Sequence, residues 1–245
     1  MKVSIITTCY NSESTILGTI KSVENQTYKN IEHIIIDGNS SDKTIDIINN
    51  NLNSKMKVIS EPDDGCYDAF NKGINKSTGE IIGFLHSDDV FYSDTVIEEM
   101  CKKIGDAPGI YGDLIYVAEK DINKKIRYWK SKKFNKSNFY FGWMPAHPTL
   151  YLRKEIYDKY GDYKTNIGTG ADYEFTVRVL FKNNIKCEYL PKIITKMRVG
   201  GLSSNNFKDR LIAHFYDWRA WTDNKISVFP FWVILKPLSK IKQYL

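Results

Sequence analysis

The stretch Ile82-Gly83-Phe84-Leu85-His86-Ser87-Asp88-Asp89 runs from an apolar segment directly into a pair of acids. The apolar half has the composition of a buried strand. Carboxylates at the end of such a strand are costly to desolvate unless something compensates their charge. A divalent cation such as Mg²⁺ or Mn²⁺, bridging Asp88 and Asp89 to a diphosphate, would compensate it. The alternative is that one of the two acids caps the next helix, which explains an isolated Asp-Asp pair equally well.

The first half of the chain alternates between strand and helix patterns around that stretch. Strands are expected at 3–8, 31–37, 56–60 and 80–85, and helices after residue 12 or 14, from 41 to 52, from 66 to 75 and from 94 to 104. This alternation predicts a parallel, doubly wound sheet, in which ligands bind beyond the carboxyl ends of the strands. Four polar clusters follow the expected strands and should share one rim: Thr7–Asn11, Asp37–Asp42, Glu61–Asp64 and His86–Asp89.

The second half of the chain is less regular. Strands are expected at 111–117, 126–129, 148–152 and 193–199, helices at 153–159 and 172–183, and a helical, aromatic segment from 207 onward. No linker separates independent domains. We therefore expect an α/β fold of Rossmann-like, mostly parallel type over residues 1–205, with a nucleotide half (1–112) and an acceptor half (113–205). Residues 206–245 would form a C-terminal helical appendage.

Composition indicates a globular protein that stays in the cytoplasm. Of 245 residues, 42% are hydrophobic and 26% charged. The four cysteines form no CxxC pair, which favours free thiols in a reducing compartment. The apolar run at the N-terminus is too short for a signal peptide, and no apolar stretch is long enough to span a bilayer.

The net charge of +6 is unevenly distributed. Residues 119–136 carry eight basic and two acidic side chains, and residues 226–245 carry three lysines and no acid; both segments also contain aromatic residues. Basic and aromatic residues together favour a phosphate-bearing partner such as a membrane surface. A solvated face explains the first segment equally well, and the tail could instead pack on the domain or on a second subunit in a homodimer. No nucleic-acid recognition motif is present.

Five motifs in order resemble glycosyltransferase family 2, within it the branch that builds bacterial O-antigen, capsule and exopolysaccharide. They are Ser4-Ile5-Ile6-Thr7-Thr8-Cys9-Tyr10-Asn11, Ile36-Asp37-Gly38-Asn39-Ser40-Ser41-Asp42, Ser60-Glu61-Pro62-Asp63-Asp64-Gly65, Asn71-Lys72-Gly73-Ile74 and Leu85-His86-Ser87-Asp88-Asp89. The resemblance covers residues 1 to 205. It implies a GT-A fold, a divalent cation (Mn or Mg) and a nucleotide-diphosphate sugar, usually UDP-linked. It also implies transfer with inversion to a saccharide on a polyprenyl diphosphate carrier, at the inner face of the plasma membrane.

The resemblance also implies roles for single residues on the donor side. The loop Thr7, Thr8, Cys9, Tyr10, Asn11 and the acid Asp37 would hold the base and ribose. Glu61 and Asp64 would line the nucleotide pocket with Lys72 close by. Asp88 would bind the metal with Asp89 beside it. His86 stands where the family often has an acid, so both a donor contact and a purely structural role remain open.

On the acceptor side, Gly168-Thr169-Gly170-Ala171-Asp172-Tyr173-Glu174-Phe175 places glycines before an acid at a helix start, which would leave room for a substrate. It resembles the family motif whose aspartate is the general base, so Asp172 is assigned that role. Glu174 is the alternative base, and Asp172 as a helix cap is the structural alternative. The resemblance places His147 near the acceptor. Arg198 could reach the diphosphate or lie free on the surface, whereas His33 and His214 are expected to be structural.

Two other functions compete with this prediction. A sugar nucleotidylyltransferase should have a glycine-rich basic loop directly after the first strand, where this chain has Thr8-Cys9-Tyr10-Asn11-Ser12-Glu13. A non-catalytic nucleotide-sugar-binding protein would need neither Asp88 nor Asp172. The absence of GxGxxG and of GxxxxGK[ST] argues against nicotinamide enzymes and P-loop nucleotidases.

Overall fold

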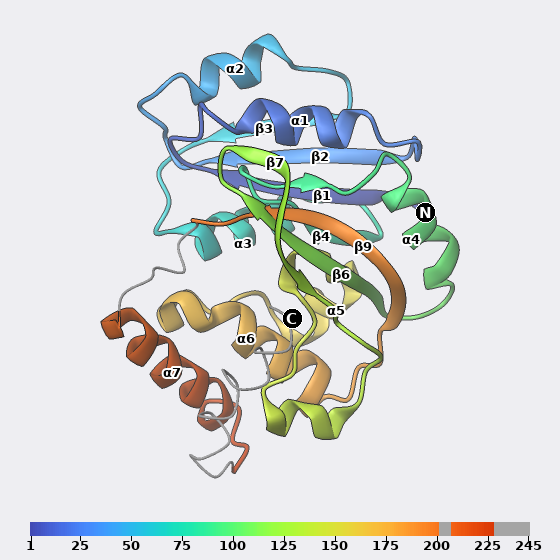
Figure 1. Ribbon diagram of the computed structural model, residues 1–245, viewed down its shortest axis with the longest axis vertical. Helices are drawn as coiled ribbons and strands as arrows, with labels where there is room; N and C mark the ends of the chain where they lie inside the picture. Colours follow the sequence, from blue (N-terminus) through green and yellow to red (C-terminus); the bar gives the residue numbers. More distant parts are fainter. Residues whose placement is uncertain (201–206, 228–245) are drawn as a thin grey trace.

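The computed structural model describes residues 1–200 and 207–227, which form one nine-stranded sheet flanked by helices (Figure 1). The strand order is β3-β2-β1-β4-β8-β6-β9-β5, and β7 pairs with β6 outside this path. The first half of the chain contains four strands, β1 Val3–Cys9, β2 Ile31–Asp37, β3 Met56–Ser60 and β4 Ile81–Phe84. They alternate with the helices α1 Ile16–Glu24, α2 Thr44–Asn50 and α3 Cys66–Lys76. These strands pair in parallel, as the sequence predicts.

Alternating side chains of the central strand explain why helices cover both faces of the sheet. Ile6 of β1 packs in one cluster with Phe70 of α3. Ile5 points to the opposite face, where it packs with Met100 of α4 (Val96–Ile104). Successive residues of a strand face opposite sides, so a strand buried on both sides is apolar throughout. The seven residues of β1 are all buried.

The second half of the sheet departs from the predicted parallel order. It contains β5 Val90–Phe91, β6 Gly109–Ala118, β7 Asp121–Trp129, β8 Tyr151–Arg153 and β9 Glu188–Arg198. Strand β8 enters antiparallel between β4 and β6, while β6 and β9 run parallel. Several predicted boundaries are wrong here. Pro148 and Thr149, predicted to begin a strand, lie in a 3₁₀ turn, because Pro148 cannot donate to a ladder. Strands β7 and β9 each begin five residues earlier than the predicted 126 and 193.

The remaining helices surround the acceptor half. They are η1 Lys136–Phe141, η2 His147–Thr149, α5 Lys154–Tyr160, η3 Thr165–Gly170, α6 Ala171–Thr176, η4 Val177–Lys182 and α7 Phe207–Thr222. The single helix predicted over 172–183 therefore divides into the α-helix α6 and a π-helical turn. Helix α7 packs beside α6 and η3 (Figure 1).

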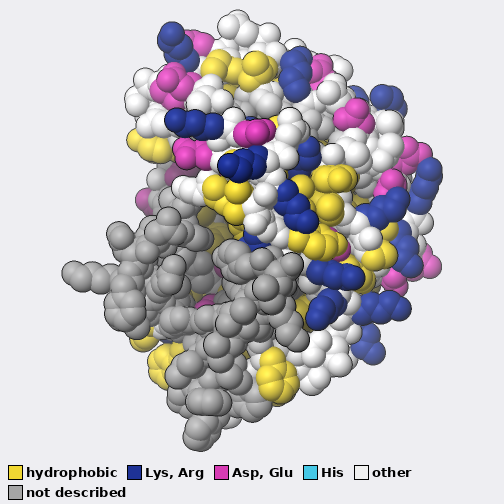
Figure 2. All heavy atoms as spheres, in the orientation of Figure 1, with side chains coloured by type: hydrophobic (Ala, Val, Ile, Leu, Met, Phe, Trp, Pro, Cys, Tyr) yellow, Lys and Arg dark blue, Asp and Glu magenta, His cyan; other side chains and the backbone are white. Residues whose placement is uncertain are grey.

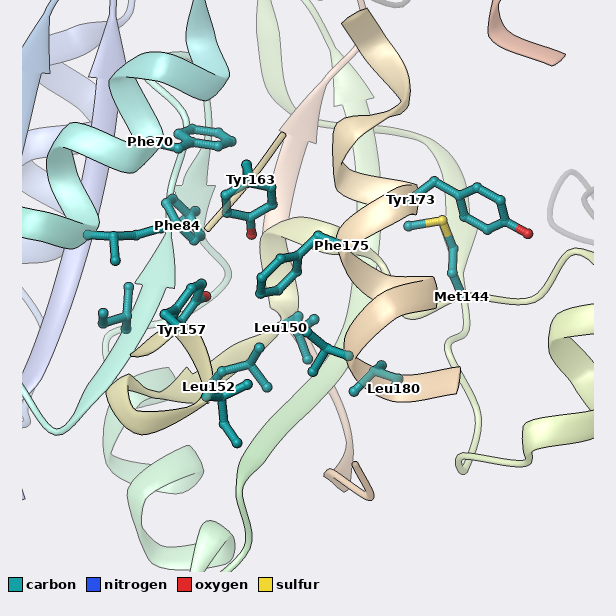
Figure 3. Packing of buried hydrophobic residues seen from close by; sticks show 14 of the residues in the cluster. Phe70, Phe84, Met144, Leu150, Leu152, Tyr157, Tyr163, Tyr173, Phe175 and Leu180 are labelled. Atoms are coloured by element: carbon teal, nitrogen blue, oxygen red, sulfur yellow. The ribbon is translucent and has the colours of Figure 1, made fainter. Parts of the chain in front are cut away.

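One hydrophobic core joins the two halves of the chain (Figure 3). Phe70 and Phe84 from the first half lie beside Tyr163 and Phe175 from the second, and the rings of Tyr163 and Phe175 stack with centroids 4.5 Å apart. The described residues of the predicted halves 1–112 and 113–205 thus contribute to the same hydrophobic cluster.

In the described residues, no helix is both long enough and apolar enough to cross a membrane. The C-terminal segment predicted to contact a membrane lies largely beyond residue 227 and so outside the described residues.

Candidate functional site

The loops after β1 and β2 hold one another at the carboxyl edge of the sheet. Asn11 adopts a positive φ of 48°, its N–H donates to Ser40 Oγ, and its side-chain oxygen accepts from the Ser41 N–H. Beside this contact, Asp37 is 0% exposed. Its carboxylate accepts hydrogen bonds from three side chains, Cys9, Ser40 and Ser60, and from the Ser40 N–H. Asp37 therefore fastens the ends of β1, β2 and β3 together.

Two residues of the β1 loop have opposite exposures. Tyr10 is 64% exposed, and its ring lies against Gly38. Thr7 is 0% exposed and its hydroxyl lies 2.9 Å from His33 Nε2. Burial lowers the pKa of His33 to about 3, so this ring is neutral near pH 7. His33 is structural, as expected, and a donor contact by Thr7 would rest on its backbone.

The residues predicted around the nucleotide pocket form a charged cluster on α3 and the loop before it. The Lys72 ammonium lies 3.2 Å from Glu61 and 3.3 Å from Asp68. Asp64 is exposed beside them. Asp63, which the sequence prediction left out, lies so close to Gly38 that a Cβ there would be 2.6 Å from its Oδ2. Its place within the quoted Glu61–Asp64 run is the feature that could have identified it.

The loop with Asp88 is held from below by α1. The Thr19 hydroxyl lies 2.8–3.3 Å from the carbonyl oxygens of His86, Ser87 and Asp89. Asp88 itself is half-buried, and no hydrogen bond or ion pair to its carboxylate is found within the described residues. The Asp88 carboxylate is thus positioned by its backbone and available to a ligand.

Asp89 and Arg198 lie together behind this loop. Asp89 is 0% exposed; its Oδ1 accepts the Arg198 N–H at 3.2 Å and its Oδ2 has no partner within the described chain. Burial, together with the charge of Asp88, raises the pKa of Asp89. The Arg198 guanidinium donates to the Glu119 carbonyl at 2.9 Å. Arg198 is therefore not free on the surface, and Asp88 is the more accessible acid of the predicted metal pair.

The two histidines of the predicted site belong to one aromatic cluster. The rings of His86 and His147 lie 6.3 Å apart, both against Phe70. His147 is 6% exposed, and its Nε2 lies 2.7 Å from the Tyr163 hydroxyl. Burial, and then the nearby His86, lowers the pKa of His147 to about 3. Asn71 holds the backbone of Tyr163 by two hydrogen bonds, so this cluster joins α3 to the acceptor half.

Asp172 lies in the first turn of α6 and faces the first turn of α3. Asp172 is half-buried. Burial, and then the charge of Asp172, raises the pKa of the Cys66 thiol to about 11. The same two causes raise the pKa of the Tyr67 phenol. The two glycines that precede Asp172 lie against Tyr216 of α7. A Cβ on Gly168 would lie 2.7 Å from the Tyr216 ring, and one on Gly170 would lie 2.6 Å from Tyr216 Cβ. These glycines make room for α7, and the predicted room for a substrate beside Asp172 stays a prediction.

Glu174, the alternative base, is occupied by its neighbours. It is 0% exposed and lies 2.9 Å from Lys164 Nζ, 3.0 Å from the Arg178 guanidinium and 3.0 Å from the Asn224 amide. Burial alone would raise the pKa of this carboxyl, but these hydrogen bonds bring it below its usual value. The arrangement makes Glu174 a structural residue, whereas Asp172 is half-buried and its Oδ1 accepts the Tyr173 N–H at 2.6 Å.

Residues 119–129 of the basic segment 119–136 form the turn after β6 and the strand β7 that pairs with it. Figure 2 shows Lys and Arg side chains interspersed with hydrophobic ones over this face. The Arg127 guanidinium lies 4.6 Å from the ring centroid of Tyr116 and 5.6 Å from that of Trp129. The charges are thus spread along an exposed edge strand.

The described residues contain no group of three or more acidic, histidine or cysteine side chains that could hold a metal alone. Mg²⁺ and Mn²⁺ in phosphate-transfer sites are commonly held by one or two carboxylates with substrate phosphates and water. Asp88 is half-buried and has no hydrogen-bond or ion-pair partner among the described residues, so it fits that kind of site.

A curled α/β sheet with acids beyond its strand ends, sharing one core with an acceptor-side helix, is the GT-A architecture. Solved structures support this fold. Staphylococcus aureus TarS 1–349 matches with a TM-score of 0.70 and 17% identity, over 99% of this chain and 72% of that one. The complex of TarS 1–349 with UDP-GlcNAc matches with a TM-score of 0.68 and 19% identity, over 88% of this chain and 65% of that one. Mannosyltransferase PcManGT from Pyrobaculum calidifontis, in complex with GDP-Man and Mn²⁺, matches with a TM-score of 0.68 and 15% identity. The match covers 98% of this chain and 69% of that one.

Sequence relatives identify the family. The model of glycosyl transferase family 2 matches residues 4–165. A "PGL/p-HBAD biosynthesis glycosyltransferase" of Mycobacterium bovis is 25% identical over 84% of this chain and 80% of its own length. An uncharacterised glycosyltransferase of Mycobacterium tuberculosis is 31% identical over 72% of this chain and 68% of its own length. The chain therefore belongs to glycosyltransferase family 2 and is a glycosyltransferase, which decides against the nucleotidylyltransferase and the non-catalytic binding protein.

Proposed function

We propose that the chain transfers a sugar, with inversion, from a UDP-sugar to a saccharide on a polyprenyl diphosphate carrier during synthesis of a bacterial surface polysaccharide. The observation that carries this proposal is a pair of half-buried carboxylates on either side of α3. Asp88 follows β4 beside His86, Asp172 lies in the first turn of α6 near Tyr67, and Phe70 and Tyr67 of α3 lie between them. Complexes of similar folds with UDP-GlcNAc and with GDP-Man and Mn²⁺ support a nucleotide-sugar donor and a divalent cation.

Asp172 acts as the general base in this proposal. It takes the proton from an acceptor hydroxyl while that oxygen forms a bond to the anomeric carbon. The bond from the anomeric carbon to the diphosphate oxygen breaks in the same step, so UDP leaves with its electron pair and the configuration inverts. Asp172 is half-buried and lies close enough to Tyr67 for its charge to raise the pKa of that phenol, which places it at the junction of α6 and α3.

Other predicted residues hold the donor. The Tyr10–Asn11 turn, the exposed Tyr10 ring and the cluster of Glu61, Asp64 and Lys72 surround the place for base and ribose. Asp37 acts by fixing this rim, since its carboxylate is already hydrogen-bonded.

On the diphosphate side, Asp88 would hold the Mn²⁺ or Mg²⁺, which would stabilise the negative charge of the leaving diphosphate. Asp89 positions Arg198 from behind. His147 positions the acceptor side through Tyr163.

We further propose that the protein works in the cytoplasm, at the inner face of the plasma membrane, because its acceptor would be lipid-linked. The homodimer considered from the tail composition stays a prediction, which light scattering after size-exclusion chromatography would check. Placement in the O-antigen, capsule or exopolysaccharide branch depends on the sugar and acceptor found.

The decisive measurement is UDP release from a panel of UDP-sugars with Mn²⁺, with GDP-mannose as a further donor. We expect Asp172→Asn to keep UDP affinity in calorimetry but to lose about 10²- to 10⁴-fold in turnover. Asp88→Ala should lose the metal-dependent part of UDP binding. Asp106→Asn, an exposed acid outside the site, is the matched control and should behave as wild type. Unchanged turnover in Asp172→Asn would remove the assigned base, and turnover only with GDP-mannose would replace the UDP donor.

A further inference from the structure

The inner face of α7 packs against η3 and against α6, whose first turn carries Asp172. Tyr216 fills the space left by Gly168 and Gly170, as described above. Trp221 is 2% exposed and donates a hydrogen bond of 3.1 Å to the hydroxyl of the tyrosine that follows Asp172. The asparagine in the turn after α7 binds the buried glutamate of α6. The position of the α6 N-terminus thus depends on α7.

The opposite face of α7 is apolar and exposed. Ile212, Phe215 and Trp218 are 49%, 53% and 39% exposed and recur every three residues, and the rings of Phe215 and Trp218 lie 6.1 Å apart. No other helix of the described chain contributes more than one exposed large hydrophobic side chain. Single exposed apolar residues are ordinary, whereas several on one helix face mark a contact surface.

We propose that this α7 outer face (Ile212, Phe215, Trp218) docks on the headgroup region of an anionic lipid surface. The proposal rests on the proposed function, because that function places the acceptor on a lipid carrier. Tryptophan, phenylalanine and isoleucine on one helix face are the residues that enter the boundary between headgroups and acyl chains. The sequence after the described residues continues in the same chemistry. From 228 to 245 it contains aromatic and aliphatic residues with lysines and no acid, which suits an anionic surface.

A second copy of the chain fits this face less well. A stable dimer usually buries about 800 Å² on each partner. Three partly exposed side chains on one helix face offer only a fraction of that area. A lipid surface has no such minimum, since each inserted side chain adds to the partition free energy independently.

One helix would then couple lipid contact to the catalytic base. Docking through the outer face would bring α7 to the lipid surface, and the inner face would hold the Asp172 loop directly beneath it. An acceptor saccharide leaving the headgroup region would meet the base without crossing the donor loops, which lie at the ends of β1 and β2 on the other side of α3 (Figure 1).

The test is flotation of the full chain with vesicles of phosphatidylcholine that contain about 30 mol % phosphatidylglycerol. The variant Ile212→Ser, Phe215→Ser, Trp218→Ser should lower the vesicle partition coefficient by about tenfold or more. The matched control is Leu17→Ser with Leu52→Ser, two apolar side chains of 44% and 53% exposure elsewhere, which should partition as wild type. UDP affinity and UDP release with a water-soluble acceptor should stay unchanged in both variants.

Two outcomes would overturn the docking proposal. The first is a triple variant that floats as well as wild type. The second is a wild type that does not float but shows a dimeric mass that the triple variant loses, which would assign the face to a second copy. Failure of the proposed function gives a different result, because wild type would then bind no UDP-sugar whether or not it floats.

Discussion

Replacing Glu174 by Gln tests whether the buried charge network of α6 stabilises the acceptor half. Glu174→Gln keeps the size of the side chain and removes the negative charge that Lys164 and Arg178 approach to 2.9 and 3.0 Å. Removing one partner of a buried ion pair costs about 3–5 kcal/mol when the other charge is left uncompensated. Here Lys164 is 36% exposed and Arg178 keeps hydrogen bonds to backbone carbonyls, so both cations stay partly solvated or paired. We therefore expect a loss of about 2–3 kcal/mol.

The assay is urea unfolding followed by tryptophan fluorescence, with Glu98→Gln as the control. Glu98 pairs with Lys102 at the same i,i+4 spacing, but at the surface, where the lysine is 72% exposed. The control should unfold at the wild-type midpoint, because exposed pairs are hydrated and screened. A loss in Glu174→Gln of less than about 0.5 kcal/mol, or an equal loss in the control, would refute the assignment of Glu174 as a buried structural charge.

The pH dependence provides a second check of the same residue. The folded state lowers the pKa of Glu174 below the usual 4.5. Its stabilising contribution is therefore complete above pH 4.5 and is lost as the pH falls through the folded pKa. The difference in unfolding free energy between wild type and Glu174→Gln should be constant from pH 5 to 7, where other groups titrate equally in both, and should shrink below about pH 4.5. A difference that grows on acidification would contradict this sign.

Three further predictions concern packing and a second buried group. Gly83→Ala should destabilise the protein by about 2–3 kcal/mol in thermal unfolding, because its Cβ would lie 1.9 Å from the Tyr151 ring; an unchanged melting temperature would contradict this. Gly18→Ala, inside α1 and 3.9 Å from its nearest neighbour, should instead stabilise by about 0.5–1 kcal/mol; a lower melting temperature would count against the α1 assignment. His33 is held neutral with a pKa of about 3, so stability should fall as the pH drops below 6.5, where the unfolded imidazole takes up a proton. His33→Gln should reduce that slope, measured as unfolding free energy from pH 7 to 5, and an equal slope would show that other groups cause it.

Much of the donor half could be predicted from sequence because the informative pattern is local. The apolar run of β1 and the helical spacing of Ile16, Ile20 and Val23 are set by neighbouring residues, and the structure confirms both. The acids follow strands directly, so their placement at the rim needs only the parallel order of β1, β2 and β4. The family resemblance added the roles of these residues, and the family itself is confirmed.

The acceptor half was predicted less well because its features depend on partners far along the chain. Strand β8 is three residues long and pairs with both β4 and β6, which no local pattern encodes. The glycines before Asp172 are explained by Tyr216, a residue of another helix. No local pattern encodes this contact with α7, and the predicted room for a substrate beside Asp172 stays a prediction.

The sequence by itself determined the fold class, the glycosyltransferase family and the rim on which Asp37 and Asp88 lie. These follow from short-range periodicity and from the order of motifs along one chain. The tertiary structure decided which acids remain accessible, because desolvation and pairing depend on groups brought together by folding. It buries Asp89 against Arg198, 109 residues away, and Glu174 against Asn224, 50 residues away, while it leaves Asp88 half-buried and without a protein partner in the described chain.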